Sequence, residues 1–283
     1  MKYAIVTDSS CDIYIKNDKE QINENVCLYR VPLRLRVGDT EYIDNSELDV
    51  NEFMTTMEQY SGPTGSAAAS PGEWYEAFKD ADEIFAVTIT SALSGSYSSA
   101  MAGMNMLLED YPDKKVYIVD SKSAGPGLTM IVRKLEQLIS EGNSFESIVA
   151  QIEEYRRNTQ VFFVLESMQN LIKNGRVNPV VGKIAGLLGI KILGHASPEG
   201  TIELLHKCRG NNMVYKKMIS TMLESGYKGG KVIISHCFNE EKVKYVIEAL
   251  EDRFGKIEAE YMPTSGLCSY YAERNGLILC FEI

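Results

Sequence analysis

The first half of the chain alternates between short apolar runs and helical patterns. Three apolar runs bounded by polar residues predict buried strands over residues 3–7, 83–90 and 116–119. Apolar positions at helical spacing predict helices over residues 97–109 and 128–140, which follow the second and third of these runs. Turns of small residues join each strand to the next helix. This repeated order predicts a parallel sheet with helices on both faces.

Three more segments of this half have their own patterns. Val31–Val37 alternates apolar and basic side chains, and Pro32 favours a half-exposed strand near a sheet edge. A helical period runs from Ser46, a possible N-cap, to Tyr60. Residues 62–72 are rich in Gly, Pro, Ser and Ala, which predicts a long polar loop of a kind that is often functional.

The pattern changes near residue 159. A strand is predicted at Val161–Leu165, and the turn at 197–200 predicts an antiparallel hairpin of residues 191–196 and 201–209. The remaining predicted elements are two helices, at 211–224 and 239–254, and three strands, at 231–235, 256–261 and 277–283. We therefore predict an α/β protein of two domains. Residues 1–158 form an N-terminal parallel-sheet α/β domain, and residues 159–283 form a C-terminal mixed or antiparallel α+β domain.

Composition excludes several classes of function. The 283 residues carry 29 Lys and Arg against 39 Asp and Glu, a net charge of −10, which argues against nucleic acid as a partner. No apolar run is long enough to span a membrane, and the N-terminus lacks a signal peptide. The six cysteines have neither metal nor disulfide spacing, so we expect reduced thiols, a cytoplasmic location and no metal site. No nucleotide-binding motif is present, and we expect no cofactor.

Several polar loops follow predicted strands, where open α/β sheets bind their ligands. One of them ends in Ser94 and Gly95 and opens the helix over 97–109. Free backbone N–H groups and serine hydroxyls at such a position form an anion site. The alternative is that Ser94 or Ser96 only caps the helix.

Catalysis by these loops has weaker support. Ser94 lacks the G-x-S-x-G context of an activated nucleophile, and the chain has only three histidines that could serve as its base. Asp8 and Asp12 are spaced more widely than the aspartates of phosphotransferases, so we expect Asp8 to orient backbone groups of neighbouring loops. A hydrolase or phosphotransferase that uses Ser94 or Asp8 stays open as an alternative function.

Residues 173–190 combine a basic turn with an apolar stretch. The turn Lys173–Arg176 is either an exposed docking loop or a helix C-cap at Gly175. The stretch that follows alternates small and aliphatic residues, which fits ordinary core packing or the wall of an apolar tunnel. The candidate wall residues are Ile184, Leu187 and Leu188 in this stretch and Ile192 just after it.

Short motifs over nearly the whole chain resemble the DegV family. They are A-I-V-T-D-S-S at 4–10, S-P-G-E-W at 70–74, I-T-S-A-L-S-G-S-Y-S-S-A at 89–100, V-D-S at 119–121, G-R-V at 175–177 and G-x-K-I-L at 189–193. The resemblance implies a two-domain protein that binds one long-chain fatty acid between its domains. It further implies a non-catalytic subunit of a bacterial fatty acid kinase. A separate ATP-binding subunit phosphorylates the carboxylate, and the acyl phosphate serves phospholipid synthesis.

The resemblance also implies roles for single residues. The family holds the carboxylate with a Thr, at the position of Ser66 here, and with the Ser of its L-S-G motif, which is Ser94 beside the Gly95 N–H. The family's third contact is a His, at whose position this chain has Thr264. Thr264 or Ser265 could replace it, or the protein could carry a different apolar acid.

Partner contacts are implied in the same way. The family's G-R loop, which faces the kinase subunit, corresponds to Gly175 and Arg176. We expect transient membrane contact at most.

Overall fold

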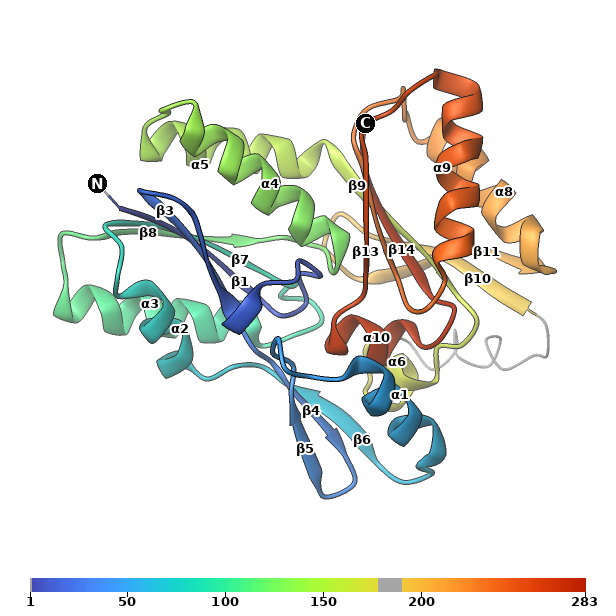
Figure 1. The fold of residues 1–283 in the computed structure, drawn as a ribbon, viewed down its shortest axis with the longest axis horizontal. Coiled ribbons are helices and arrows are strands. Elements are labelled where there is room, and N and C mark those ends of the chain that lie inside the picture. The colour runs from blue at the N-terminus through green and yellow to red at the C-terminus, as the bar shows by residue number, and fades with distance from the viewer. Residues whose placement is uncertain (1, 178–189) are drawn as a thin grey trace.

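The computed structural model describes residues 2–177 and 190–283. Two sheets lie side by side, and a smaller third sheet lies beside them (Figure 1). The prediction of an α/β fold with a parallel-rich first sheet and a mixed second sheet is confirmed.

The first sheet is built from residues before position 121. Its strand order is β2-β3-β1-β7-β8, and β1, β3, β7 and β8 run parallel while β2 is an antiparallel edge strand. The strands are β1 (Tyr3–Asp8), β2 (Lys19–Asn23), β3 (Val26–Val31), β7 (Glu83–Thr88) and β8 (Lys115–Asp120). A short 3-10 helix, η1 (Lys16–Asp18), precedes β2.

Helices cover both faces of this sheet because its buried strands carry apolar side chains on both sides. On β1, Ala4 and Val6 pack with α2 (Pro71–Phe78) and α3 (Ser96–Asp110), whereas Ile5 packs with α4 (Pro126–Ser140) and α5 (Phe145–Arg157). Figure 1 shows these two helix layers above and below the sheet.

The second sheet is built from residues after position 158. Its order is β11-β10-β9-β14-β12-β13, and β12–β13 is its one parallel pair among the described strands. The strands are β9 (Thr159–Leu165), β10 (Ile190–Ala196), β11 (Ile202–Arg209), β12 (Val232–His236), β13 (Ala259–Pro263) and β14 (Leu277–Glu282). The predicted hairpin of residues 191–209 is confirmed as β10 and β11.

The two faces of this second sheet have different partners. Phe162 and Val164 on β9 pack beneath α8 (Asn211–Glu224) and α9 (Glu240–Phe254) in the largest core. Val161, Phe163 and Leu165 alternate to the opposite face, which lies toward the first half of the chain.

The third sheet and its helices join the two halves. The antiparallel strands β5 (Thr40–Ile43), β4 (Arg34–Val37) and β6 (Thr64–Ala67) pack with α1 (Val50–Gln59) and α10 (Gly266–Ala272) around one core. A short helix, α6 (Gln169–Lys173), contacts α10.

The predicted half-exposed strand and the helix are present in this region, but the edge position of the strand and the N-cap at Ser46 were wrong. Pro32 separates β3 from β4 rather than lying in one edge strand, and β4 is the central strand of its sheet. The helix begins at Val50, because Asp49 rather than Ser46 caps it by accepting a hydrogen bond from the Glu52 N–H.

The predicted loop at 62–72 contains a strand. Thr64–Ala67 forms β6, whose backbone pairs with β4. Its small, polar residues give no hydrophobic alternation, so the pairing is invisible in the sequence pattern. Ser70 then begins α2 through a capping box with Glu73.

Candidate functional site: an apolar cavity between the two halves of the chain

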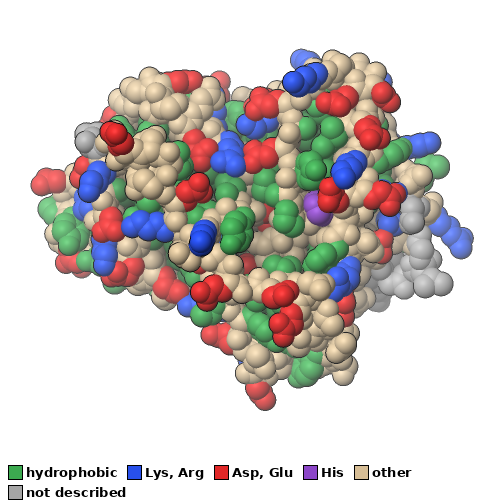
Figure 2. Space-filling view, viewed as in Figure 1, with side chains coloured by type: hydrophobic (Ala, Val, Ile, Leu, Met, Phe, Trp, Pro, Cys, Tyr) green, Lys and Arg blue, Asp and Glu red, His purple; other side chains and the backbone are tan. Residues whose placement is uncertain are grey.

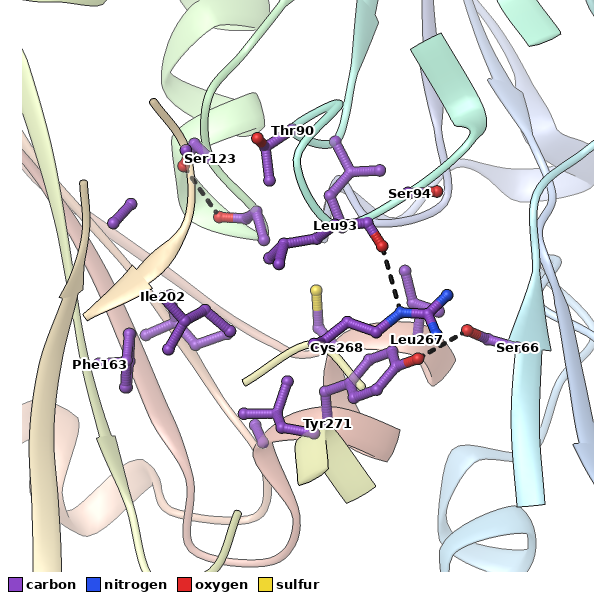
Figure 3. A pocket seen from close by; sticks show the side chains of 18 of the residues that line it. Ser66, Thr90, Leu93, Ser94, Ser123, Phe163, Ile202, Leu267, Cys268 and Tyr271 are labelled. Carbon is purple, nitrogen blue, oxygen red and sulfur yellow. Dashed lines mark hydrogen bonds between the residues drawn. The ribbon is translucent and has the colours of Figure 1, made fainter. Parts of the chain in front are cut away.

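A cavity of about 300 Å³ lies between the face of the second sheet that carries Val161, Phe163 and Leu165 and the loops that follow β7 and β8 (Figure 3). This volume is at the lower end of the range of about 300–1,000 Å³ for small-molecule sites. Its lining is mostly apolar and comes from both halves. The first half contributes Leu33, Ser66–Ala68, Ile89, Thr90, Leu93–Gly95, Ser123 and Ala124. The second half contributes Val161, Phe163, Leu165, Leu171, Arg176, Ala196, Gly200–Ile202, Leu267, Cys268, Tyr271, Ala272 and Ile278.

The two ends of the cavity differ in polarity. Figure 3 places Ser66 and Ser94 toward one side and the apolar Phe163 and Ile202 toward the other, with Thr90 and Ser123 along the top of the cavity. At the polar end, the hydroxyls of Ser66 and Tyr271 are hydrogen-bonded at 2.8 Å. The arrangement suits an elongated molecule with a polar head and an apolar tail.

Ser94 and Gly95 lie where the sequence predicts, at the cavity and at the start of α3. The Ser94 hydroxyl accepts a hydrogen bond from the Ser96 N–H at 3.2 Å, so it also supports the first helical turn. Gly95 is the N-cap, and a Cβ built on it meets no heavy atom within 4 Å. The backbone here is therefore open to an approaching ligand.

Asp8 holds the Ser94 loop in place from the first strand. Its buried carboxylate accepts hydrogen bonds from the Ile89 N–H at 2.9 Å and from the Ser96 hydroxyl at 2.6 Å, on either side of the loop. It also accepts from the N–H and hydroxyl of Ser10. Burial raises the pKa of Asp8, and these hydrogen bonds oppose that rise. The expectation that Asp8 orients neighbouring loops is confirmed.

Arg176 contributes to the cavity rather than to an exposed loop alone. Its side chain is half-buried, and its Nε donates to the Leu93 carbonyl at 3.2 Å. It thereby joins the end of α6 to the Ser94 loop. Among the described lining residues, Arg176 is the only one with a charged side chain.

Thr264 and Ser265 are not brought to this cavity. Both are buried, and they line a second hollow near His236 instead. The Thr264 hydroxyl is hydrogen-bonded to that of Ser269 at 2.7 Å, and the Ser265 hydroxyl donates to the Ser9 carbonyl at 2.6 Å. The motif alignment predicts both residues at the site, but they lie just before α10 and face the second hollow instead.

Of the four candidate tunnel-wall residues, Ile192 lies within the described part of the chain. Ile184, Leu187 and Leu188 lie outside the described residues. Ile192 is fully buried in a core cluster that also holds the lining residues Phe163 and Leu171, but it does not itself line the cavity.

The sequence reasoning missed two groups of lining residues. Tyr271 lies on α10, a helix that the hydrophobic pattern does not predict. Phe163 and its neighbours lie on a predicted strand, where the apolar run gives no sign that one face borders a cavity.

The hairpin turn closes one side of the cavity. Gly200 has φ +84°, and a Cβ built on it would lie 2.1 Å from the Thr90 hydroxyl oxygen. Only glycine permits this approach between the β10–β11 turn and the loop after β7.

The described residues offer little for catalysis or metal binding at the cavity. No His, Asp, Glu or Lys is among the described lining residues, so no general base faces Ser94 there. Over residues 2–177 and 190–283, no group of three metal-binding side chains occurs. In the same ranges, no helix has the length and apolarity to cross a bilayer.

The chain matches the family model described as "Uncharacterised protein, DegV family" over residues 2–281. It belongs to the DegV family. A DegV domain-containing protein of Streptococcus gordonii is 41% identical, with all of both chains covered.

Solved DegV structures have the same fold. A DegV family protein from Eubacterium eligens, loaded with heptadecanoic acid, has a TM-score of 0.93, 39% identity and 99% coverage of both chains. The Streptococcus pneumoniae Fatty Acid Kinase (Fak) B3 protein, loaded with linoleic acid, has a TM-score of 0.95, 38% identity and full coverage of both chains.

Proposed function

We propose that this DegV protein binds one long-chain fatty acid in the cavity and presents its carboxylate to a separate ATP-dependent fatty acid kinase subunit. The observation that carries the proposal is the polarity of the cavity, apolar along the second sheet and hydroxyl-lined near Ser66 and Ser94. Relatives at 38–39% identity are loaded with heptadecanoic and linoleic acids, which supports the same ligand class here.

The apolar tail supplies the affinity. Each buried methylene contributes about 0.8 kcal/mol, so a chain of roughly 16 carbons gains about 12 kcal/mol before the costs of association. The carboxylate must then meet donors, because an unpaired buried charge is costly. We assign this task to the hydroxyls of Ser66 and Ser94 and to the Gly95 N–H.

The position proposed for the head group supports presentation to a kinase. Gly95 and Ala67 line the cavity and are exposed, so the carboxylate would lie near the surface. Neutral hydroxyl donors leave it anionic and able to attack a phosphoryl group, while the tail stays buried. In this proposal the protein itself is not catalytic, and the two domains meet near residues 158–159. We retain Arg176, at the same end of the cavity, as a kinase contact.

We also propose that nucleic acid is not a partner, which fits the face of the molecule shown in Figure 2. Acidic and basic side chains are interspersed on the face shown, with no continuous basic surface. A nucleic-acid site would concentrate positive charge.

Native mass spectrometry of the purified protein, followed by extraction of the ligand, tests the binding proposal. We expect one fatty acid per chain, and weaker retention in Ser94→Ala. A protein that is empty and stays empty with palmitate and oleate would contradict the proposal. Incubation with a fatty acid kinase subunit and ATP tests presentation, since acyl phosphate should form only when both proteins are present.

A further inference from the structure

Two adjacent tyrosines on α10 reach the same strand of the third sheet. Tyr270 bonds to the Thr64 hydroxyl at 2.7 Å, and Tyr271 bonds to the Ser66 hydroxyl at 2.8 Å. Thr64 and Ser66 are two residues apart on β6, so their side chains share a face. The two pairs look equivalent along the chain, but their surroundings differ.

Tyr270 is a structural residue. It is fully buried, and its hydroxyl also accepts a hydrogen bond from the Asn174 amide at 2.8 Å. It therefore has two partners and does not line the cavity.

The hydroxyl of Tyr271 has fewer hydrogen-bond partners than that of Tyr270. It lines the cavity, and within the described residues Ser66 is the only hydrogen-bond partner of its hydroxyl. Two hydroxyls carry two protons, and their mutual hydrogen bond uses one. The second proton can be donated to a ligand at the polar end of the cavity.

The chemistry of Tyr271 suits an anionic head group. Burial raises the pKa of its phenol, and the Ser66 hydrogen bond and the positive charge of Arg176 only partly offset that rise, so the phenol stays protonated at neutral pH. A protonated phenol is uncharged and can donate a hydrogen bond to a carboxylate. The carboxylate keeps its negative charge in this contact.

We infer that Tyr271, paired with Ser66, is a further head-group contact of the fatty acid carboxylate beside Ser94 and Gly95, at the end of the cavity where Thr264 and Ser265 are absent. This inference rests on the proposed function. The hydroxyl pair of Ser66 and Tyr271, which joins the two halves of the chain, would then make the protein prefer a fatty acid over a neutral lipid.

The experiment compares the affinities of delipidated protein for palmitate and for hexadecanol, which share a tail and differ in the head group. We expect Tyr271→Phe to weaken palmitate binding about tenfold, equivalent to 1.4 kcal/mol. Hexadecanol binding should change much less, so the preference for the acid falls. Tyr270→Phe is the matched control: it also removes one hydroxyl from α10, and it should leave the preference unchanged.

The outcomes separate the inference from the proposed function. If the wild-type protein binds neither lipid, the proposed function fails, and this inference fails with it. If it binds palmitate but Tyr271→Phe keeps the wild-type preference, or Tyr270→Phe loses as much, only the inference is overturned. Ser66→Ala removes the other hydroxyl of the pair and should also lower the preference for palmitate over hexadecanol. This variant provides a second measurement if Tyr271→Phe folds poorly.

Discussion

At the scale of single residues, buried carboxylates position the loops around the site. Asp8 accepts from the Ile89 N–H, Asp12 accepts from the Ser265 N–H at 2.8 Å, and Asp44 accepts from two N–H groups at the start of α10. Each joins segments that are distant in the sequence. A buried carboxylate that has several donors stabilises such a join, whereas an unpaired one would be costly. Of the six carboxylate oxygens, Oδ2 of Asp12 has no hydrogen-bond partner among the described residues. These aspartates therefore have a structural explanation that requires no catalytic role.

Asp44 makes the stability of the protein depend on pH. Burial raises its pKa to about 6, although Arg30 and the N–H groups of Gly266 and Leu267 oppose the rise. Since the ordinary pKa is 3.8, the folded state binds more protons than the unfolded state between these values. The contribution of Asp44 to the free energy of unfolding should therefore fall by roughly 3 kcal/mol as pH rises from about 4 to about 6, and then level off.

Urea unfolding of the wild type and of Asp44→Asn across this pH range checks this prediction. Asp8 and Asp12 titrate in both proteins, so their contributions cancel in the difference of the two unfolding free energies. A difference that is constant with pH, or that grows as pH rises, would show that the pKa of Asp44 is not raised.

At the scale of elements, the β9–β10 pair shapes the apolar end of the cavity. Phe163 on β9 lies directly opposite Gly194 on β10, and a Cβ built on Gly194 would lie 2.3 Å from the Phe163 ring. The ring therefore lies across the glycine, where a side chain would displace it. This close approach holds the ring at the cavity wall.

The ring should limit the length of the bound chain. Phe163→Leu frees space, and each further methylene that becomes buried contributes about 0.8 kcal/mol. We expect the affinity for stearate to rise relative to palmitate by up to about tenfold, measured by displacement of a fluorescent fatty acid.

Phe162→Leu serves as the control for this measurement. It shortens a side chain on the same strand that faces the opposite core, so it should reduce stability without changing the stearate-to-palmitate ratio. Equal ratios in all three proteins would mean that Phe163 does not set the chain length.

At the scale of the whole molecule, the cavity lies where the two halves meet. Its lining comes from both sides of residue 158, and α4 packs against strands of the second sheet as well as the first. A ligand held there contacts both halves in the folded state and loses its site when they separate.

Ligand binding should therefore stabilise the whole fold. A fatty acid at 100 times its Kd adds about 2.7 kcal/mol to the free energy of unfolding. We expect delipidated protein to unfold at lower denaturant than the loaded protein, and palmitate to restore the difference. Acetate has the same head group without the tail, and at equal concentration it should have no effect. A midpoint that does not respond to palmitate would contradict binding between the halves.

The sequence predicts elements best where burial creates a pattern. The apolar runs of β1, β7 and β9 and the helical periods of α3 and α8 match the structure to within two residues, because each buries a regular stripe or face. Strand β6 and helix α10 are missed. The first pairs through its backbone, and the second is a short helix whose start is held by Asp44 from another part of the chain.

The site likewise has a part that the local sequence predicts and a part that depends on distant contacts. By itself, the sequence determined the α/β class and the serine loop around Ser94, because local spacing encodes both. Only the tertiary structure decided which distant side chains share the cavity. It brings Tyr271 on α10 to Ser66 and leaves Thr264, between β13 and α10, facing the second hollow, because the direction of each side chain depends on how the two halves pack.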